Sequence, residues 1–224
     1  MVSLDKVVPW GRSYDEYRRM FALTAGDLAG RILGCGDGPA SFNAEATARG
    51  TRVVSCDPIY QFDAGDLQTR IDVTKTQVLA HTRKNADQFV WDAIPSIEAL
   101  EQVRMSAMRR FLADYPAGQA AGRYVAAALP SLPFADGEFD LALSSHLLFL
   151  YSAQLGKDFH LQSMFELCRV AREVRVFPLL ALNGGPSLLV APVSLALAAR
   201  GLRVTIDTVD YEFQRGGNLT HLPH

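Results

Sequence analysis

The sequence predicts an α/β fold, in which a mostly parallel, doubly wound sheet carries helices on both faces. Three observations lead to this fold class. Residues Arg31–Asp57 read as a strand, a tight glycine turn, a helix and a second strand, which together make one βαβ unit. A buried strand opens at Asp140, and residues 202–222 read as two strands around a glycine-containing turn.

The composition fits one globular domain over residues 1–224, with enough apolar side chains for a sizeable core. The 22 basic and 24 acidic side chains nearly cancel, which argues against a dedicated nucleic-acid-binding protein. Cys35, Cys56 and Cys168 have neither C-x-x-C spacing nor a clustered histidine. We therefore interpret them as reduced core residues, not as disulfides or metal ligands.

This pattern of cysteines leads us to expect a cytoplasmic protein. The first ten residues lack the long apolar run of a signal peptide. Ser187–Ala199 is apolar but too short to cross a bilayer, so no membrane partner is expected.

The N-terminal region predicts a loop over residues 9–12, followed by a helix. Ser13 and Glu16 fit a capping box, in which the serine accepts from the Glu16 amide and the glutamate side chain reaches back. The helix should run to about Leu23.

Three glycines at alternate positions, Gly34, Gly36 and Gly38, mark the turn after the first strand. Glycine lets the backbone turn sharply and leaves room for a ligand. Asp57 ends the second strand, where an acidic residue can accept from both ribose hydroxyls of an adenosine. Pro39 takes the place of the third glycine in a nicotinamide fingerprint, and no G-x-x-x-x-G-K-[ST] phosphate loop is present. The sequence therefore disfavours NAD and nucleoside triphosphates.

Leu33–Gly38 resembles motif I of the class I S-adenosylmethionine (SAM)-dependent methyltransferases. Leu132–Asp140 is similar to the LPF-x-D-x-x-FD pattern that small-molecule members of this family often carry before the fourth strand. The resemblance implies a seven-stranded sheet closed by an antiparallel hairpin, SAM as cofactor and S-adenosylhomocysteine as its product. The cofactor-binding positions that it implies are Tyr14, Gly34, Cys35, Gly36, Gly38, Asp57, Pro58, Ile59, Ala128, Leu129, Ser144 and Ser145.

Two positions depart from the family's pattern. Ile32 stands where an acidic residue usually anchors the methionine amino group, so that contact must come from backbone carbonyls or elsewhere. Ala128 replaces the acid that often contacts the adenine amino group, which leaves apolar packing and backbone amides near Ala128 and Leu129 to hold adenine. Arg12 and Tyr14 either face the methionine end of SAM or serve only in helix capping and surface packing.

The fourth strand ends in Ser144-Ser145-His146, at the position that faces the methyl group in this family. His146 is a general base, a hydrogen-bond donor to substrate or a residue that only caps the strand, and with Tyr151 it is a catalytic candidate. The D/N-P-P-Y/F sequence of amino-group nucleic-acid methyltransferases is absent. The predicted acceptor cavity is surrounded by Ser145, His146, Tyr151 and Asn183, with Tyr14 or Arg12 above it.

Residues 61–122 exceed the one short helix that this fold needs between the second and third strands. One helix is predicted within residues 72–85, and another after Pro95, with Ser96 as N-cap and an end at Pro116–Gly118. We interpret the segment as a helical insertion whose basic side chains are either a solvated helix face or a contact for an anionic partner. Those side chains are Lys75, Arg83, Lys84, Arg104, Arg109 and Arg110.

The remaining elements complete the predicted sheet. Residues 123–127 give a third strand, 173–182 a fifth in which Pro178 suggests a bulge or an exposed edge, and 202–213 a sixth with Val204, Ile206 and Val209 toward the core. Helices are predicted over residues 161–172, with His160 on the surface, and over residues 187–200. A turn at 214–218 leads to the last strand, 219–222.

The predicted function is methyl transfer from SAM to a small-molecule acceptor, for which the protein mainly supplies proximity, alignment and a dry site. One alternative is a SAM-binding protein without transferase activity, which Ile32 and Ala128 favour. Another is a protein or nucleic-acid methyltransferase that docks through the basic insertion. A nicotinamide oxidoreductase comes last, because of Pro39 and the closing hairpin.

Overall fold

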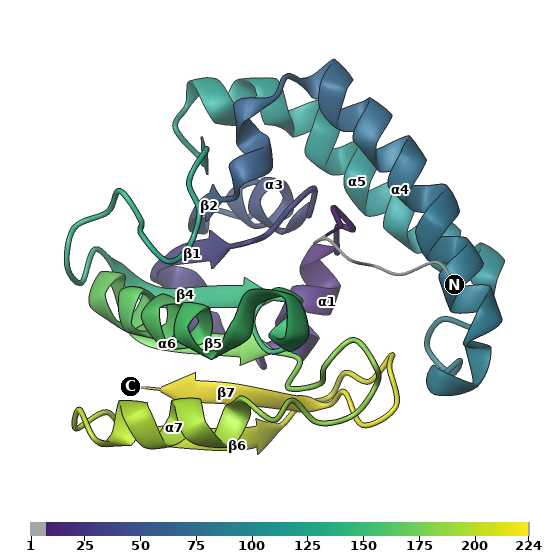
Figure 1. Ribbon diagram of the computed structural model, residues 1–224. Helices are drawn as coiled ribbons and strands as arrows, with labels where there is room; N and C mark the ends of the chain where they lie inside the picture. Colours follow the sequence, from purple (N-terminus) through teal and green to yellow (C-terminus); the bar gives the residue numbers. More distant parts are fainter. Residues whose placement is uncertain (1–7, 224) are drawn as a thin grey trace.

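The computed structural model describes residues 8–223, apart from the side chain of Leu222 (Figure 1). The strands are β1 Arg31–Cys35, β2 Arg52–Cys56, β3 Tyr124–Val125, β4 Phe139–Ser145, β5 Ala171–Phe177, β6 Val204–Thr208 and β7 Leu219–Pro223. The α-helices are α1 Tyr14–Met20, α2 Ala25–Ala29, α3 Phe42–Thr47, α4 Ala64–Lys84, α5 Ile97–Ala120, α6 Ser152–Val170 and α7 Val190–Ala198. Two 3₁₀ turns are η1 Pro58–Gln61 and η2 Ala86–Gln88.

The seven strands form one sheet in the order β3-β2-β1-β4-β5-β7-β6. The first five run parallel, and β7 pairs antiparallel with both β5 and β6. The predicted seven-stranded sheet with a closing antiparallel hairpin is confirmed. Because the chain winds outward from β1 in one direction and from β4 in the other, the order reverses between these two neighbours. Ligands of open α/β sheets bind outside the carboxyl ends of the strands at such a reversal.

The central strands are buried on both faces, and their side chains alternate between two apolar clusters. Ile32 and Leu141 join the cluster under α1 and α3, whereas Leu33 and Ala142 join the one under α6 and α7. All four side chains are at most 3 % exposed. Figure 1 shows α6 and α7 together on one side of the sheet, with α1 and α3 apart from them. Full burial of a side chain such as Leu33 contributes about 1.5–3 kcal/mol, so this region is the stable base for the loops at the strand ends.

Residues 61–122 fold into a pair of long helices, α4 and α5, which Figure 1 shows side by side. Their inner ends pack on Tyr60 and Tyr124 through Leu67, Phe111 and Tyr115. The first helix of the pair begins earlier than predicted, at Ala64 with Asp63 as N-cap, and runs to Lys84. Ser96 caps the second helix as predicted, accepting from the Ala99 amide at 3.1 Å.

The predicted end of the second insertion helix at Pro116–Gly118 is wrong, because α5 continues through Pro116 to Ala120. Proline removes one intrahelical hydrogen bond and crowds the preceding turn. The last turn is nevertheless held by buried Tyr115 and by Gly118, whose missing side chain leaves room for the ring of Tyr124. Tertiary packing therefore overrides the local stop signal.

The prediction of a surface position for His160 is also wrong. The helix α6 starts at Ser152, well before the predicted start, and His160 is fully buried within it. Its Nε2 accepts from the Phe149 amide at 3.0 Å, and its Nδ1 lies 2.6 Å from the Gly156 carbonyl oxygen. A neutral ring protonated on Nδ1 satisfies both contacts. Burial lowers the pKa of His160, consistent with a structural histidine that carries no charge.

Several strands end at other residues than predicted, because a strand at the edge of the sheet or next to a proline forms fewer backbone hydrogen bonds with its neighbours. Strand β3 keeps only two of the five residues predicted, and β5 ends at Phe177, directly before Pro178. The sixth strand is short, and Ile206 on it is 48 % exposed, so its predicted place in the core is wrong. Val209, predicted with it, is buried.

The N-terminal capping box is confirmed, but the helix that it starts ends at Met20 instead of Leu23. The Ser13 amide donates to Glu16 Oε2 at 2.9 Å, and the Glu16 amide donates to Ser13 Oγ at 3.3 Å. A second capping box, Thr24 with Asp27, starts the short helix α2.

Candidate functional site

A cavity of about 220 Å³ lies at the carboxyl ends of β1 and β4, where the strand order reverses. The glycine turn after β1 forms one wall, with Gly36 at φ +71° and Gly38 at φ +55°. These left-handed conformations favour glycine. A side chain at Gly36 would also meet Leu147 at 2.6 Å, so the turn depends on glycine both for its conformation and for its close packing.

Asp57 closes the far side of this turn. Its Oδ2 accepts from the Gly38 amide and its Oδ1 from the Ile59 amide, both at 2.9 Å. The carboxylate therefore ties the glycine turn to the start of η1 while it also lines the cavity. A carboxylate has about four acceptor positions, so two remain for a ligand. Burial raises the pKa of Asp57 to about 6, although the two amide bonds act in the opposite direction.

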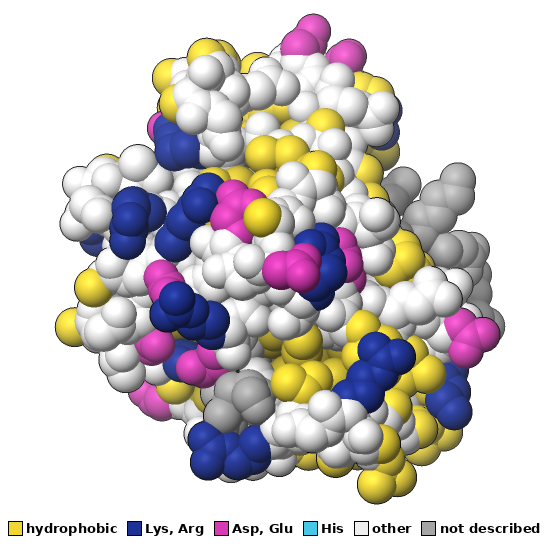
Figure 2. All heavy atoms as spheres, turned by 90° about the vertical axis from the view of Figure 1, so that its left-hand side faces the viewer, with side chains coloured by type: hydrophobic (Ala, Val, Ile, Leu, Met, Phe, Trp, Pro, Cys, Tyr) yellow, Lys and Arg dark blue, Asp and Glu magenta, His cyan; other side chains and the backbone are white. Residues whose placement is uncertain are grey.

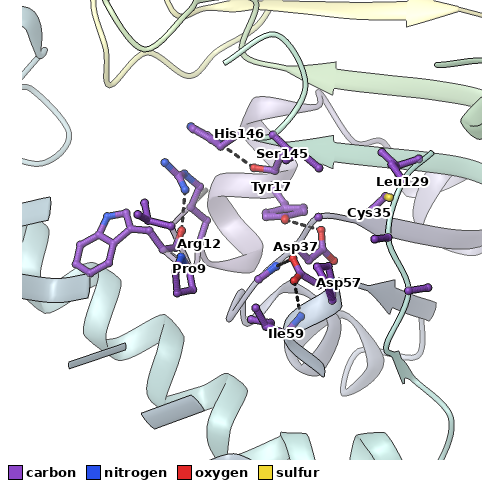
Figure 3. Close-up of a pocket in the computed structure, with 18 of the residues that line it drawn as sticks. Pro9, Arg12, Tyr17, Cys35, Asp37, Asp57, Ile59, Leu129, Ser145 and His146 are labelled. Atoms are coloured by element: carbon purple, nitrogen blue, oxygen red, sulfur yellow. Dashed lines mark hydrogen bonds between the residues drawn. The ribbon is translucent and has the colours of Figure 1, made fainter. Parts of the chain in front are cut away.

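Asp37, inside the glycine turn, is a second buried acid that the sequence reasoning missed. Tyr17 donates its hydroxyl hydrogen to Asp37 Oδ1 at 2.8 Å (Figure 3). Ser55 Oγ donates to Asp37 Oδ2 at 2.6 Å. The carboxyl group folds back over Gly34, where any side chain would collide with it. Burial, together with the charge of Asp57, raises the pKa of Asp37 to about 6. The available signal was an acid between two glycines in the sequence Gly36-Asp37-Gly38.

The structure gathers most of the predicted cofactor-binding residues around this one cavity. Those that line it are Cys35, Gly36, Gly38, Asp57, Pro58, Ile59, Ala128, Leu129 and Ser145. Cys35 and Cys56 are both free and buried. Phe159 of α6 also lines the cavity, as do Ile59 and Leu129, and no sequence signal had indicated this aromatic side chain.

Tyr14, Gly34 and Ser144 do not line the cavity. The Tyr14 ring stacks on Phe42 with centroids 5.9 Å apart, and Ser144 is fully buried in β4. The residue of α1 that reaches the cavity is Tyr17, one turn after Tyr14. The helix was thus expected near the cleft, but the sequence did not indicate which of its tyrosines faces it.

His146 follows β4 in a left-handed conformation, with φ +57°. Its amide donates to the Phe177 carbonyl at 2.7 Å, and its Nδ1 lies 2.8 Å from Ser145 Oγ. Burial, then the charges of Arg12 and Arg104, lower the pKa of His146 well below its ordinary value. The imidazole is therefore neutral near pH 7.

A second cavity, of about 130 Å³, shares Val8, Trp10, Arg12 and His146 with the first. Tyr151 lines this second cavity, and its hydroxyl accepts from the Val8 amide at 3.3 Å. The predicted acceptor residues are thus divided: Ser145 lies in the first cavity, Tyr151 in the second, and His146 in both. Asn183 lines neither of them and accepts from the Gly185 amide at 3.1 Å.

Three of the six basic side chains named for the insertion form ion pairs within the protein. Arg104 is buried and forms an ion pair with Glu16. Arg110 lies 2.9 Å from Glu45, and Lys75 lies 3.5 Å from Glu101. On the face that Figure 2 shows, basic side chains lie among acidic ones and form no continuous basic surface.

Within residues 8–223, no group of three or more His, Cys, Asp or Glu side chains is arranged to hold a metal ion. No helix in this part of the chain is long and apolar enough to cross a bilayer.

No protein-family model matches the sequence. The uncharacterized protein MJ0045 of Methanocaldococcus jannaschii is 31 % identical over 220 residues, which cover 97 % of this chain and 96 % of that protein. Among solved structures, an O-methyltransferase family protein from Burkholderia thailandensis is similar, with a TM-score of 0.50 and 9 % identity over 91 % of this chain and 53 % of that one. This chain thus spans about half the length of the Burkholderia protein. A SAM-dependent methyltransferase from Aquifex aeolicus gives a TM-score of 0.45 and 12 % identity, over 93 % of this chain and 90 % of that one. The resemblance to class I methyltransferases is confirmed at the level of the fold.

Proposed function

The chain belongs to the family of the uncharacterized protein MJ0045, and we propose that it binds SAM in the cavity beside β1 and β4 and transfers a methyl group to a small molecule. One observation carries the proposal: a glycine turn and two buried carboxylates line one cavity at the reversal point of a methyltransferase-type sheet. When bound, SAM supplies a methyl group already activated on a sulfonium.

The residues of the cavity fit the parts of SAM. Asp57 keeps two acceptor positions for the ribose hydroxyls after binding two backbone amides. Ile59, Leu129 and Phe159 offer an apolar site for adenine. Asp37 offers an anionic acceptor for the methionine ammonium group, which compensates for the apolar Ile32. The raised pKa values of the two acids agree with sites that a cationic ligand stabilises.

His146 is suited to accept a proton from the acceptor group. With a proton on Nδ1 donated to Ser145 Oγ, its Nε2 keeps a free lone pair. Its low pKa keeps it neutral, and its position between the two cavities gives it access to both. Positioning and exclusion of water then supply most of the rate enhancement, and the base adds to them.

The alternatives receive less support. Asp37 offsets the missing acid at Ile32, which was one of the two reasons to expect binding without transfer. The ion pairs of Arg104, Arg110 and Lys75 engage three of the six basic side chains through which the insertion would dock on a polymer.

Isothermal titration calorimetry with SAM, S-adenosylhomocysteine and NAD tests the proposal. We expect micromolar dissociation constants, about −8 kcal/mol, for the first two and no binding of NAD. Binding of NAD without binding of SAM would refute it. Asp57→Ala serves as the site variant, and Asp207→Ala on the exposed strand β6 serves as the matched control.

A further inference from the structure

The two adjoining cavities differ in the sign of the charges that line them. Asp37 and Asp57 line the first, whereas none of the described residues that line the second is Asp or Glu. Arg12 and Arg104 both line the second cavity. Complementary charge favours a cationic ligand in the first cavity and an anionic ligand in the second.

Of the two arginines, only Arg104 has its charge balanced. It is 1 % exposed and paired with Glu16, which also accepts from the Tyr211 hydroxyl at 2.9 Å. Burial alone would raise the pKa of Glu16, but the charges of Arg104 and Arg12 lower it to about 2, so it is ionised. These three ionised side chains together leave one positive charge uncompensated.

The uncompensated charge belongs to Arg12. Its Nη1 donates to the Trp10 carbonyl at 2.8 Å, but its buried Nε has no hydrogen-bond partner. No carboxylate within residues 8–223 forms an ion pair with this guanidinium. Burial and the charge of Arg104 lower the pKa of Arg12 to about 10, although the charge of Glu16 acts in the opposite direction, and Arg12 stays protonated near pH 7. Arg12 is partly buried, and a charge in such a place without a carboxylate partner is costly, so a bound anion lowers that cost.

Arg12 lines both cavities, and its guanidinium lies at their shared wall. Figure 3 shows the end of the Arg12 side chain beside His146, away from Asp57 and Ile59. The lowering of the His146 pKa by Arg12 agrees with this closeness. Arg12 thus lies near the junction of the cavities, on the opposite side from the predicted ribose and adenine positions.

Six of the described residues that line the second cavity are Phe, Tyr or Trp. Its volume of about 130 Å³ is close to the ~150 Å³ that suffices for a benzene ring in a protein core. Aromatic walls favour a flat ligand through offset-stacked and edge-to-face contacts. The aromatic side chains that line it include Trp10, Phe89, Tyr151, Phe177, Tyr211 and Phe213.

We propose that the second cavity binds the methyl acceptor, and that this acceptor is a single-ring aromatic carboxylate whose carboxylate is held by Arg12. A hydroxyl or amino group on the ring then lies near His146, at the junction with the first cavity. This inference rests on the proposed function of the first cavity. Residues of α4 and α5 line this second cavity. The proposal therefore gives the helical insertion a role in selecting the substrate.

The test compares each of 2-, 3- and 4-hydroxybenzoate with its neutral amide. Binding to the protein saturated with S-adenosylhomocysteine is measured by calorimetry. We expect at least one hydroxybenzoate to bind at least tenfold more tightly than its amide, a comparison that needs no variant. Arg12→Gln should remove that preference, Arg12→Lys should restore part of it, and exposed Arg18→Gln should leave it unchanged. The affinity for S-adenosylhomocysteine should change less than threefold in Arg12→Gln.

The outcomes separate this inference from the proposed function. If S-adenosylhomocysteine binds but no hydroxybenzoate is preferred over its amide, the acceptor assignment is wrong and the cofactor assignment stands. If Arg12→Gln abolishes S-adenosylhomocysteine binding and keeps the preference for carboxylates, Arg12 holds the cofactor instead, and the inference is overturned. If wild-type protein binds neither SAM nor S-adenosylhomocysteine, the proposed function itself fails.

Discussion

Replacing Asp37 by asparagine should stabilise the ligand-free protein while weakening its affinity for SAM. The substitution keeps the shape of the side chain and removes its charge. In the wild-type fold, burial raises the pKa of Asp37 from 3.8 to about 6. Because each whole number in pKa corresponds to 1.36 kcal/mol, the ionised carboxylate costs the ligand-free fold about 3 kcal/mol at pH 7. Asparagine avoids this cost.

Part of this gain in stability is lost because asparagine cannot accept from both hydroxyl groups that donate to Asp37. Tyr17 and Ser55 each donate to one Asp37 oxygen, whereas the side-chain amide of an asparagine at this position offers only one acceptor oxygen. One hydroxyl must then turn to accept from the amide nitrogen, at a cost of about 1 kcal/mol. We expect a net stabilisation of about 2 kcal/mol at pH 7. The loss of a charged acceptor for the ammonium group should weaken SAM binding by about 1.5–3 kcal/mol.

The stability gained by Asp37→Asn should depend on pH in a direction that the raised pKa of Asp37 fixes. For an acid whose pKa is higher in the folded state, the destabilisation is complete above pH 6 and is lost as the pH falls toward 3.8. The stability advantage of Asp37→Asn should therefore be present at pH 7 and shrink between about pH 6 and pH 4. Urea unfolding at several pH values, with and without S-adenosylhomocysteine, measures both effects. Asp207→Asn, in exposed β6, is the control. A variant that is less stable at pH 7 and binds SAM normally would show that Asp37 only anchors Tyr17 and Ser55.

Four further substitutions test other parts of the site. Asp57→Ala should lose about 2–3 kcal/mol of SAM affinity in calorimetry, and unchanged affinity would restrict Asp57 to tying the glycine turn to η1. Gly36→Ala should lower the free energy of unfolding by more than ~1 kcal/mol, because φ is +71° and the new methyl group meets a leucine at 2.6 Å; a wild-type urea midpoint would contradict this. His146→Ala should keep SAM affinity and reduce turnover of an accepted substrate about 100-fold in a methyl-transfer assay, whereas undiminished turnover would exclude the base role. Arg104→Met should destabilise the protein by about 3–5 kcal/mol in urea unfolding, since Glu16 is left buried and unpaired, and a smaller loss would indicate that water reaches the pair.

Features encoded by neighbouring residues were predictable from the sequence. The capping box of Ser13 and Glu16 forms because both partners lie within one helical turn. The turn through Gly36 and Gly38 forms because it needs left-handed backbone that glycine adopts freely. Asp57 falls at the end of β2 because the buried run before it has the length of one strand. These local signals predicted the βαβ unit and its glycine turn, and the resemblance to class I methyltransferases that they support implied the complete sheet and the cofactor-binding positions.

Features that depend on distant residues required the tertiary structure. The role of Asp37 depends on Tyr17, 20 residues away, and on Ser55, 18 residues away. His160 was expected at the surface, and only the folded helix shows that its ring satisfies the Phe149 amide and the Gly156 carbonyl group in the interior.

The sequence by itself determined the βαβ unit, its glycine turn and the turn of the closing hairpin, because these follow from periodicity and backbone preference within short stretches; the complete seven-stranded sheet was implied by the resemblance to class I methyltransferases. Only the tertiary structure decided which charges share a cavity. Glu16 neutralises Arg104, 88 residues away, while Arg12 stays uncompensated between two cavities. The net charge of a buried site depends on residues from separate elements, so it cannot be read from any short stretch of the sequence.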